Sequence, residues 1–158
     1  MKIHIQLATE ENLHIVHRLM REAFEEYRFL DVPSSALTEP FVQLIDAYKN
    51  GKEHAVLCVV DGVALGSARF KTKEQSIYFS RLSVTPSARG KGIAKAMLAW
   101  LEEYAVEQGK EKIECLVRAT LPENIRLYSS IGYVVVNEEI VTNPNGFSVN
   151  VVAMEKEV

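Results

Sequence analysis

Two glycines, one residue apart, stand between an arginine and a lysine in the stretch 89–94, "RGKGIA". Glycine is favoured where the backbone must adopt a positive φ or where a ligand approaches it closely. Apolar residues at helical spacing follow, so the second glycine falls where a helix begins. The first N–H groups of a helix lack internal partners and can bind an anion. The stretch therefore predicts a phosphate or pyrophosphate site, to which Arg89 and Lys91 add positive charge.

Three other interpretations of this stretch compete with the phosphate site. A Walker A loop requires GxxxxGK[ST], and that spacing is absent here. A dinucleotide-binding motif requires GxGxxG after the first strand of a βαβ unit, whereas Gly90 begins only GxGxxK, late in the chain. A glycine-containing helix start without any ligand is the remaining alternative.

The same six residues match (Arg/Gln)-x-x-Gly-x-(Gly/Ala), the coenzyme A pyrophosphate motif of the GCN5-related N-acetyltransferase (GNAT) family. About 30 residues later, Leu127-Tyr128 and Gly132-Tyr133 resemble the family's second signature, a tyrosine-bearing helix that ends in Gly-(Phe/Tyr). Two motifs in the correct order are far more specific than either motif alone. The chain resembles this family over nearly its whole length.

The resemblance implies an acetyl-CoA cosubstrate and no metal. It implies that the pantetheine arm pairs with the backbone of Leu82, Ser83 and Val84, as an added strand would. It also implies that the pyrophosphate lies on the N–H groups of the glycine stretch, formed by Arg89, Gly90, Lys91, Gly92, Ile93 and Ala94.

Tyr128 matches the family tyrosine that protonates the departing thiolate, and its hydroxyl is neutral near pH 7. Asn124 lies on the same helix face, four residues earlier. Many family members place a coenzyme-contacting Asn seven residues before the tyrosine, where this chain has Leu121. Asn124 is therefore either a coenzyme contact or a first-turn residue that bonds local backbone groups.

The acceptor site is expected around the loop "YRFLDVPSS", where Tyr27 and Phe29 either form an apolar wall or pack the helix junction. Arg81 and Arg118 lie near strand ends that should border the cleft. They are either solvated or salt-bridged, or they bind a carboxylate on the acceptor.

The general base is not assigned, because residues 77–81 lack the strand carboxylate that many members carry. The amine proton could leave through water, through Glu114 or Glu74, or the amine could already be weakly basic. The expected function is transfer of acetyl to a primary amine of a small molecule, by direct attack in a ternary complex. The alternatives are a non-catalytic acyl-CoA sensor and a protein N-terminal or lysine acetyltransferase.

The order of elements predicted from periodicity is β-α-α-β-β-β-α-β-α-β-β. Asp61-Gly62 marks a hairpin, and Thr38 is the expected N-cap of the second helix. Strand 76–84, the helix from residue 93 and strand 112–117 predict one parallel pair with a right-handed crossover. The predicted fold class is α/β (α+β), with one mixed, mostly antiparallel sheet of about seven strands and about four helices. The resemblance implies that this is a GNAT fold with a splayed parallel pair at the cofactor site.

The whole chain, 1–158, is expected to form one domain. Its net charge of −3 argues against general nucleic-acid binding. Cys58 and Cys115 lie in apolar runs and are expected to be reduced thiols of a cytoplasmic protein. No signal peptide or membrane span is predicted. The apolar C-terminal strands could pair across a homodimer.

Overall fold

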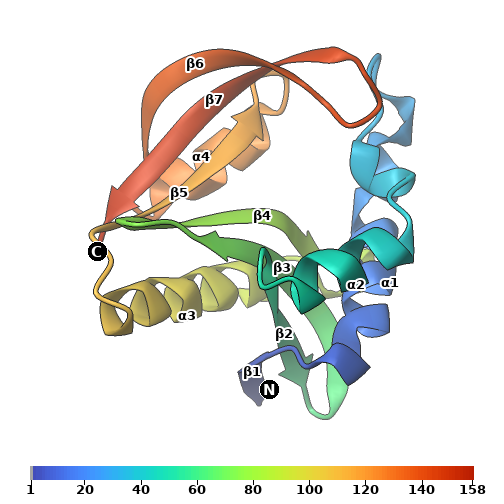
Figure 1. The fold of residues 1–158 in the computed structure, drawn as a ribbon, viewed down its shortest axis with the longest axis vertical. Helices are drawn as coiled ribbons and strands as arrows, with labels where there is room; N and C mark the ends of the chain where they lie inside the picture. Colours follow the sequence, from blue (N-terminus) through green and yellow to red (C-terminus); the bar gives the residue numbers. More distant parts are fainter. Residues whose placement is uncertain (1) are drawn as a thin grey trace.

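All seven predicted strands join one mixed sheet in the computed structural model, which describes residues 2–158. The sheet order is β1-β2-β3-β4-β5-β7-β6 (Figure 1). Every neighbouring pair is antiparallel except β4 and β5, as predicted. The strand bounds are β1 Ile3–Leu7, β2 His54–Val60, β3 Val63–Thr72, β4 Ser76–Val84, β5 Lys112–Arg118, β6 Val134–Thr142 and β7 Ser148–Glu157.

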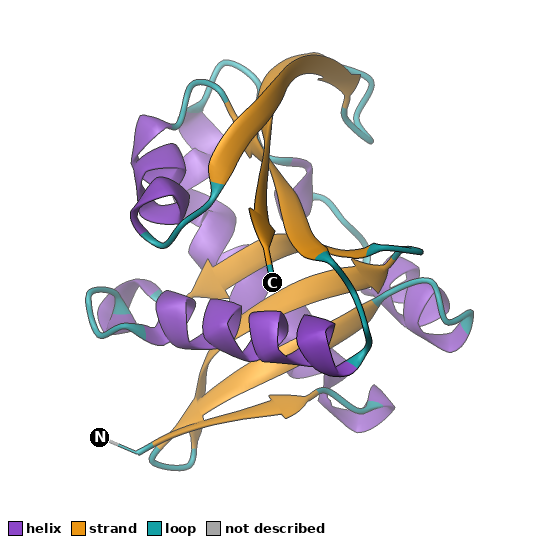
Figure 2. Ribbon diagram, turned by 90° about the vertical axis from the view of Figure 1, so that its left-hand side faces the viewer, coloured by secondary structure: helices purple, strands orange, loops and turns teal. Residues whose placement is uncertain are grey.

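Helices cover both faces of the sheet, with α3 (Ile93–Glu107) crossing one face and α1 (Leu13–Phe24) lying behind the other (Figure 2). α2 (Phe41–Lys49) packs beside α1, and α4 (Pro122–Ser130) lies on the α3 side. The β2–β3 turn has positive φ at both Asp61 (50°) and Gly62 (85°). Those values suit the two-residue hairpin turn that the sequence predicts.

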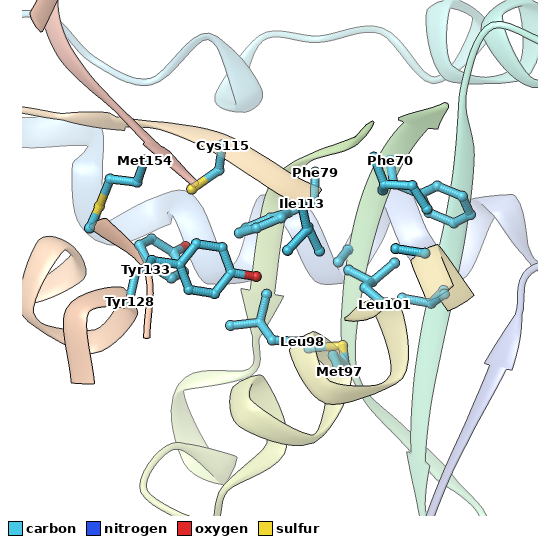
Figure 3. Packing of buried hydrophobic residues seen from close by; sticks show 14 of the residues in the cluster. Phe70, Phe79, Met97, Leu98, Leu101, Ile113, Cys115, Tyr128, Tyr133 and Met154 are labelled. Atoms are coloured by element: carbon cyan, nitrogen blue, oxygen red, sulfur yellow. The ribbon is translucent and has the colours of Figure 1, made fainter. Parts of the chain in front are cut away.

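The main core lies between the sheet and helices α3 and α4 (Figure 3). α3 buries the apolar face expected from its periodicity, formed by Ile93, Met97, Leu98, Leu101 and Ala105. Burying one large apolar side chain contributes roughly 1.5–3 kcal/mol. This helix therefore fixes the glycine stretch at its N-terminus against the end of β4.

The start of the second helix differs from the prediction. Thr38 does not cap α2; instead it ends a short 3-10 turn, η3 (Ser35–Leu37). The N-cap of α2 is Pro40, which is extended at φ −67° and ψ 145°. The residue before a proline is disfavoured in the helical region, so Glu39 is a poor first helical residue, which is what a Thr38 cap would require. The first helix also ends early and continues as a 3-10 segment, η2 (Glu25–Phe29).

The C-terminal hairpin extends beyond the rest of the sheet, and β6 forms its edge. The exposed apolar side chains on β6 are Val134, Val135, Val136 and Ile140. An edge strand leaves one row of N–H and C=O groups unpaired. Pairing of this edge across a homodimer stays a prediction. Separately, no helix within residues 2–158 is both long enough and apolar enough to cross a membrane.

Candidate active site

A cleft of about 1100 Å³ opens where β4 and β5 separate. Its floor is formed by β3, β4, β5 and β7. Its walls come from the end of α1, the η3–α2 region, α4 and the β6–β7 turn. Residues of both predicted half-sites, donor and acceptor, line this one cleft.

The separation of β4 from β5 creates the opening. Their parallel pairing is limited to Ser76–Tyr78 with Lys112–Glu114. Beyond it, Leu82 and Val84 of β4 line the cleft, as do Leu116 and Arg118 of β5. Ser83 points away from the cleft, because its side chain is buried and its hydroxyl donates to the Arg81 carbonyl at 2.9 Å. The backbone of 82–84 thus borders the gap into which the predicted pantetheine arm would extend.

The glycine stretch has the backbone that an anion cradle needs. Gly90 and Gly92 have φ of 79° and 80°, in the left-handed region that favours glycine. A Cβ built at either position would meet no atom within 4 Å, so the space in front of both is open. The N–H of Ala96 makes the first helical bond, to Gly92, which leaves the preceding N–H groups without helical partners. These features fit a pyrophosphate.

The other residues of the stretch have different positions. Ala94 lines the cleft and Lys91 is exposed. Ile93 is buried in the core, so it offers the site only its backbone. The Arg89 guanidinium also lines the cleft. It is turned toward the wall formed by the end of α1 and by η2, here called the acceptor wall, where it donates to the Glu26 carboxylate and to the Ala23 carbonyl.

Tyr128 projects from α4 to the base of the opening and lines the cleft. Its ring packs edge-on against Phe79 of β4, with centroids 5.6 Å apart. Burial raises the pKa of its hydroxyl far above the usual value, and the neighbouring Cys115 adds to the effect. The hydroxyl therefore stays protonated at neutral pH, as a proton donor must.

Tyr133 lies beside Tyr128 (Figure 3), with ring centroids 5.8 Å apart. It does not line the cleft, and its buried hydroxyl has no hydrogen-bond partner among residues 2–158. Two neighbouring tyrosines thus differ in access, because only Tyr128 reaches the cleft.

Only part of the loop "YRFLDVPSS", where the acceptor site was expected, lines the cleft. Tyr27 lines the cleft, and the Asn124 amide donates to its hydroxyl at 3.4 Å. Burial raises the pKa of Tyr27. Asn124 thus connects α4 to the acceptor wall. Phe29 is 91% exposed and does not line the cleft.

Arg81 and Arg118 both line the cleft, and both contact the segment 32–35, which leads into η3. Arg81 donates to the Ser35 hydroxyl at 3.0 Å. Arg118 donates to the Val32 carbonyl and, at 3.2 Å, to the Pro33 carbonyl. Neither forms a salt bridge within the described chain, so the salt-bridged alternative is not what the structure contains.

The sequence did not reveal a buried ionic cluster beside Arg81. The Arg69 guanidinium pairs with Glu39 and Glu53, and all three side chains are at most 8% exposed. Burial alone would lower the pKa of Arg69, but the two carboxylates raise it overall. The alternation of β3 could have indicated that Arg69 faces away from Ala68 and Phe70. Its partners could not be predicted, because they come from two other segments.

The acids suggested as general bases lie outside the cleft lining. Glu114 pairs with Lys73 at 2.5 Å, and neither Glu114 nor Glu74 lines the cleft. The acids that do line it are Glu26, Glu39, Glu53 and Glu123. The first three are already bound to arginines.

The model of the acetyltransferase (GNAT) family matches residues 13–133, which include both sequence motifs and most of the cleft. The chain belongs to the GNAT family. This protein is therefore an N-acetyltransferase of a family that uses acetyl-CoA as its acyl donor.

One curated relative and two solved structures show how far the similarity reaches. The GNAT chain is 26% identical over 138 residues to the N-terminal acetyltransferase B complex catalytic subunit naa20 of Schizosaccharomyces pombe, covering 79% of this chain and 76% of that protein. The PaiA N-acetyltransferase of Thermoplasma acidophilum, solved with coenzyme A, superimposes with a TM-score of 0.79 at 17% identity over 100% of both chains. A chimera of the spermidine N-acetyltransferase SpeG from Vibrio cholerae and hSSAT gives 0.77 at 18% identity, over 99% of this chain and 96% of that one. The two structures establish the fold.

Proposed function

We propose that this protein transfers the acetyl group of acetyl-CoA to a primary amine of a small molecule, by direct attack within a ternary complex. The observation that carries the proposal is the early separation of β4 from β5, which leads into a cleft that Tyr128 reaches. Donor and acceptor can meet there without a covalent enzyme intermediate.

Two parts of the chain would hold the donor. The backbone of 82–84 would pair with the pantetheine amides, and the N–H groups of 89–94 would bind the pyrophosphate. When bound, acetyl-CoA supplies an acetyl thioester. A backbone N–H at the β4–β5 gap would stabilise the thioester carbonyl oxygen, where negative charge develops.

Tyr128 would act as the general acid. The acceptor nitrogen forms a bond with the acetyl carbonyl carbon while the C–S bond breaks, and the leaving sulfur takes the Tyr128 proton. The nitrogen loses its own proton to water, and water restores the proton of Tyr128. The position of Tyr128 supports this role, because its hydroxyl is neutral near pH 7 and the residue lines the cleft beside the β4–β5 gap.

A contact between two walls of the cleft favours a small acceptor. The Thr38 hydroxyl donates to the Asn145 side-chain oxygen at 3.3 Å, which joins the η3–α2 connection to the β6–β7 turn. Both segments line the cleft through neighbouring residues, and Figure 1 shows the hairpin tip approaching this region. A cleft bridged in this way suits a short molecule better than an extended peptide.

A protein acceptor is the second candidate, and the similarity to naa20 favours it. One assay separates the candidates. Acetyl-CoA is supplied with a panel of small amines and of peptides, and CoA release is followed. The product is then identified by mass spectrometry. Acetylated small amines support the proposal. Acetylation of peptides alone supports the second candidate, and an absence of turnover despite CoA binding supports a sensor.

Tyr128→Phe tests the general acid, with Tyr133→Phe as a matched control. Removing the Tyr128 hydroxyl should lower kcat by about 10²–10⁴-fold while leaving the Kd for acetyl-CoA nearly unchanged. Tyr133→Phe removes a neighbouring buried hydroxyl that does not reach the cleft, so kcat should stay near the wild-type value. An unaltered kcat in Tyr128→Phe would refute the assignment.

A further inference from the structure

The backbone of Arg81 is unusual for a residue in a strand. Its φ is 53°, one of two positive values at non-glycine residues within 2–158. The pairing Ser67–Ser83 and Arg69–Ser80 shows that β4 carries one extra residue here, a β-bulge. A left-handed residue with a side chain costs roughly 1–2 kcal/mol. Bulges redirect side chains, and this one places the guanidinium in the cleft.

The Arg81 guanidinium has few partners where it lies. A guanidinium has five N–H donors, and here one hydrogen bond is made, to Ser35. Arg69 occupies the two nearby carboxylates, Glu39 and Glu53. Arg81 is half-buried, and burial lowers its pKa because the charge is poorly solvated. A half-buried cation with unused donors is a favourable place for an anion.

Arg118 brings a second such cation to the same place from the other side of the gap. Its contacts with Val32 and Pro33 lie within three residues of the Ser35 contact of Arg81. Both of its bonds go to neutral carbonyls, and no carboxylate within residues 2–158 forms an ion pair with it. The cleft thus holds two arginines, one from each separated strand, that converge on one short loop.

The lining of the whole cleft also has an excess of positive charge. It includes six cationic and four acidic side chains, although the chain as a whole has a net charge of −3. Lys52 and Lys71 on the lining have no ion-pair partner in the described chain. The buried Nδ2 of Asn143, another lining residue, lacks a hydrogen-bond acceptor there. The lining is therefore rich in donors and short of anions.

From this arrangement we infer that Arg81, assisted by Arg118, binds a carboxylate of the acceptor, so that the acceptors are amino-acid-like molecules that carry both a primary amine and a carboxylate. The inference rests on the proposed function and names its substrate class. Planar guanidinium groups bind carboxylates with two parallel hydrogen bonds, which would orient the amine toward the β4–β5 gap. Arg81 is a specificity-determining residue in this scheme.

The first test needs no variant. Acetyl transfer to a series of free amino acids is compared with transfer to the matching amino-acid carboxamides, which keep the amine but lose the negative charge. We expect kcat/KM to be at least about tenfold higher for the carboxylates. Phosphoethanolamine, a polyamine and short peptides complete the panel. The inference is overturned if carboxamides, phosphoethanolamine, polyamines or peptides are turned over as well as free amino acids or better. Turnover of any of the small amines leaves the proposed function standing.

The second test uses Arg81→Gln, with Arg18→Gln on the exposed side of α1 as the control. In Arg81→Gln, KM for amino acids should rise about tenfold or more, with KM for carboxamides and for acetyl-CoA unchanged. Arg18→Gln should change none of them. If Arg81→Gln does not fold, the comparison of carboxylates with carboxamides in the wild-type enzyme decides.

Binding of N-acetylamino acids to the CoA-bound protein, measured by calorimetry, tests the carboxylate site independently of acetyl transfer. If no small amine is acetylated, the proposed function fails. The carboxylate site is then supported by N-acetylamino acids that bind and lose affinity about tenfold in Arg81→Gln. It is overturned if they do not bind or if the variant binds them equally well.

Discussion

The guanidinium of Arg89, in the glycine stretch, donates to the carboxylate of Glu26, on the acceptor wall. A residue that the family motif assigns to the donor site is thereby bound to the other half of the cleft. Both side chains are close to half exposed, so the pair is accessible to a competing anion. A pyrophosphate on the stretch would compete with Glu26 for Arg89.

Glu26→Gln should therefore strengthen coenzyme A binding. Exposed ion pairs contribute about 0.2–1 kcal/mol, so the Kd for coenzyme A should fall by a factor of roughly 1.4 to 5. Isothermal titration measures this directly. Glu25→Gln is the matched control, because Glu25 pairs with Arg28 on the same segment and does not line the cleft. A weaker or unchanged affinity in Glu26→Gln would contradict the competition.

Gly90→Ala separates backbone strain from ligand contact. The positive φ should lower the free energy of unfolding by about 1 kcal/mol. The new methyl group would also enter the open space in front of the stretch, so the Kd for coenzyme A should rise about tenfold or more.

Gly51→Ala is the control for that experiment, because Gly51 has a φ of 70° with open space around it and lies at the end of α2. It should show a similar loss of stability with unchanged affinity. Equal affinities in the two variants would place the pyrophosphate elsewhere.

Arg69→Leu should be strongly destabilising. It removes the ion-pair partner of the buried carboxylates of Glu39 and Glu53, and breaking a buried ion pair typically costs about 3–5 kcal/mol. Urea unfolding followed by circular dichroism provides the measurement. Arg18→Leu, in an exposed pair with Glu22, should change stability by no more than about 0.5 kcal/mol.

A triple variant checks the cause of that loss. Adding Glu39→Gln and Glu53→Gln to Arg69→Leu removes the stranded charges, so part of the stability should return. If the triple variant is no more stable than Arg69→Leu alone, lost packing rather than uncompensated charge explains the effect.

Features that depend on local sequence were predicted well. The seven strands, the Asp61-Gly62 turn and the apolar face of α3 follow from periodicity and turn chemistry, which act within a few residues. The two GNAT motifs are also local, and the family that they indicated is confirmed by the family match over residues 13–133. Thr38 failed as a cap because Pro40, two residues on, delayed the helix.

The sequence by itself thus determined the family, the order of elements and the residues expected to hold the donor. Only the tertiary structure decided what those residues contact. It paired Arg89 with Glu26, 63 residues away, and buried Arg69 between Glu39 and Glu53, 30 and 16 residues away. It also placed the β4 bulge that turns Arg81 into the cleft. Long-range ion pairs and bulges depend on how distant segments pack, and residue types and spacing do not specify that packing.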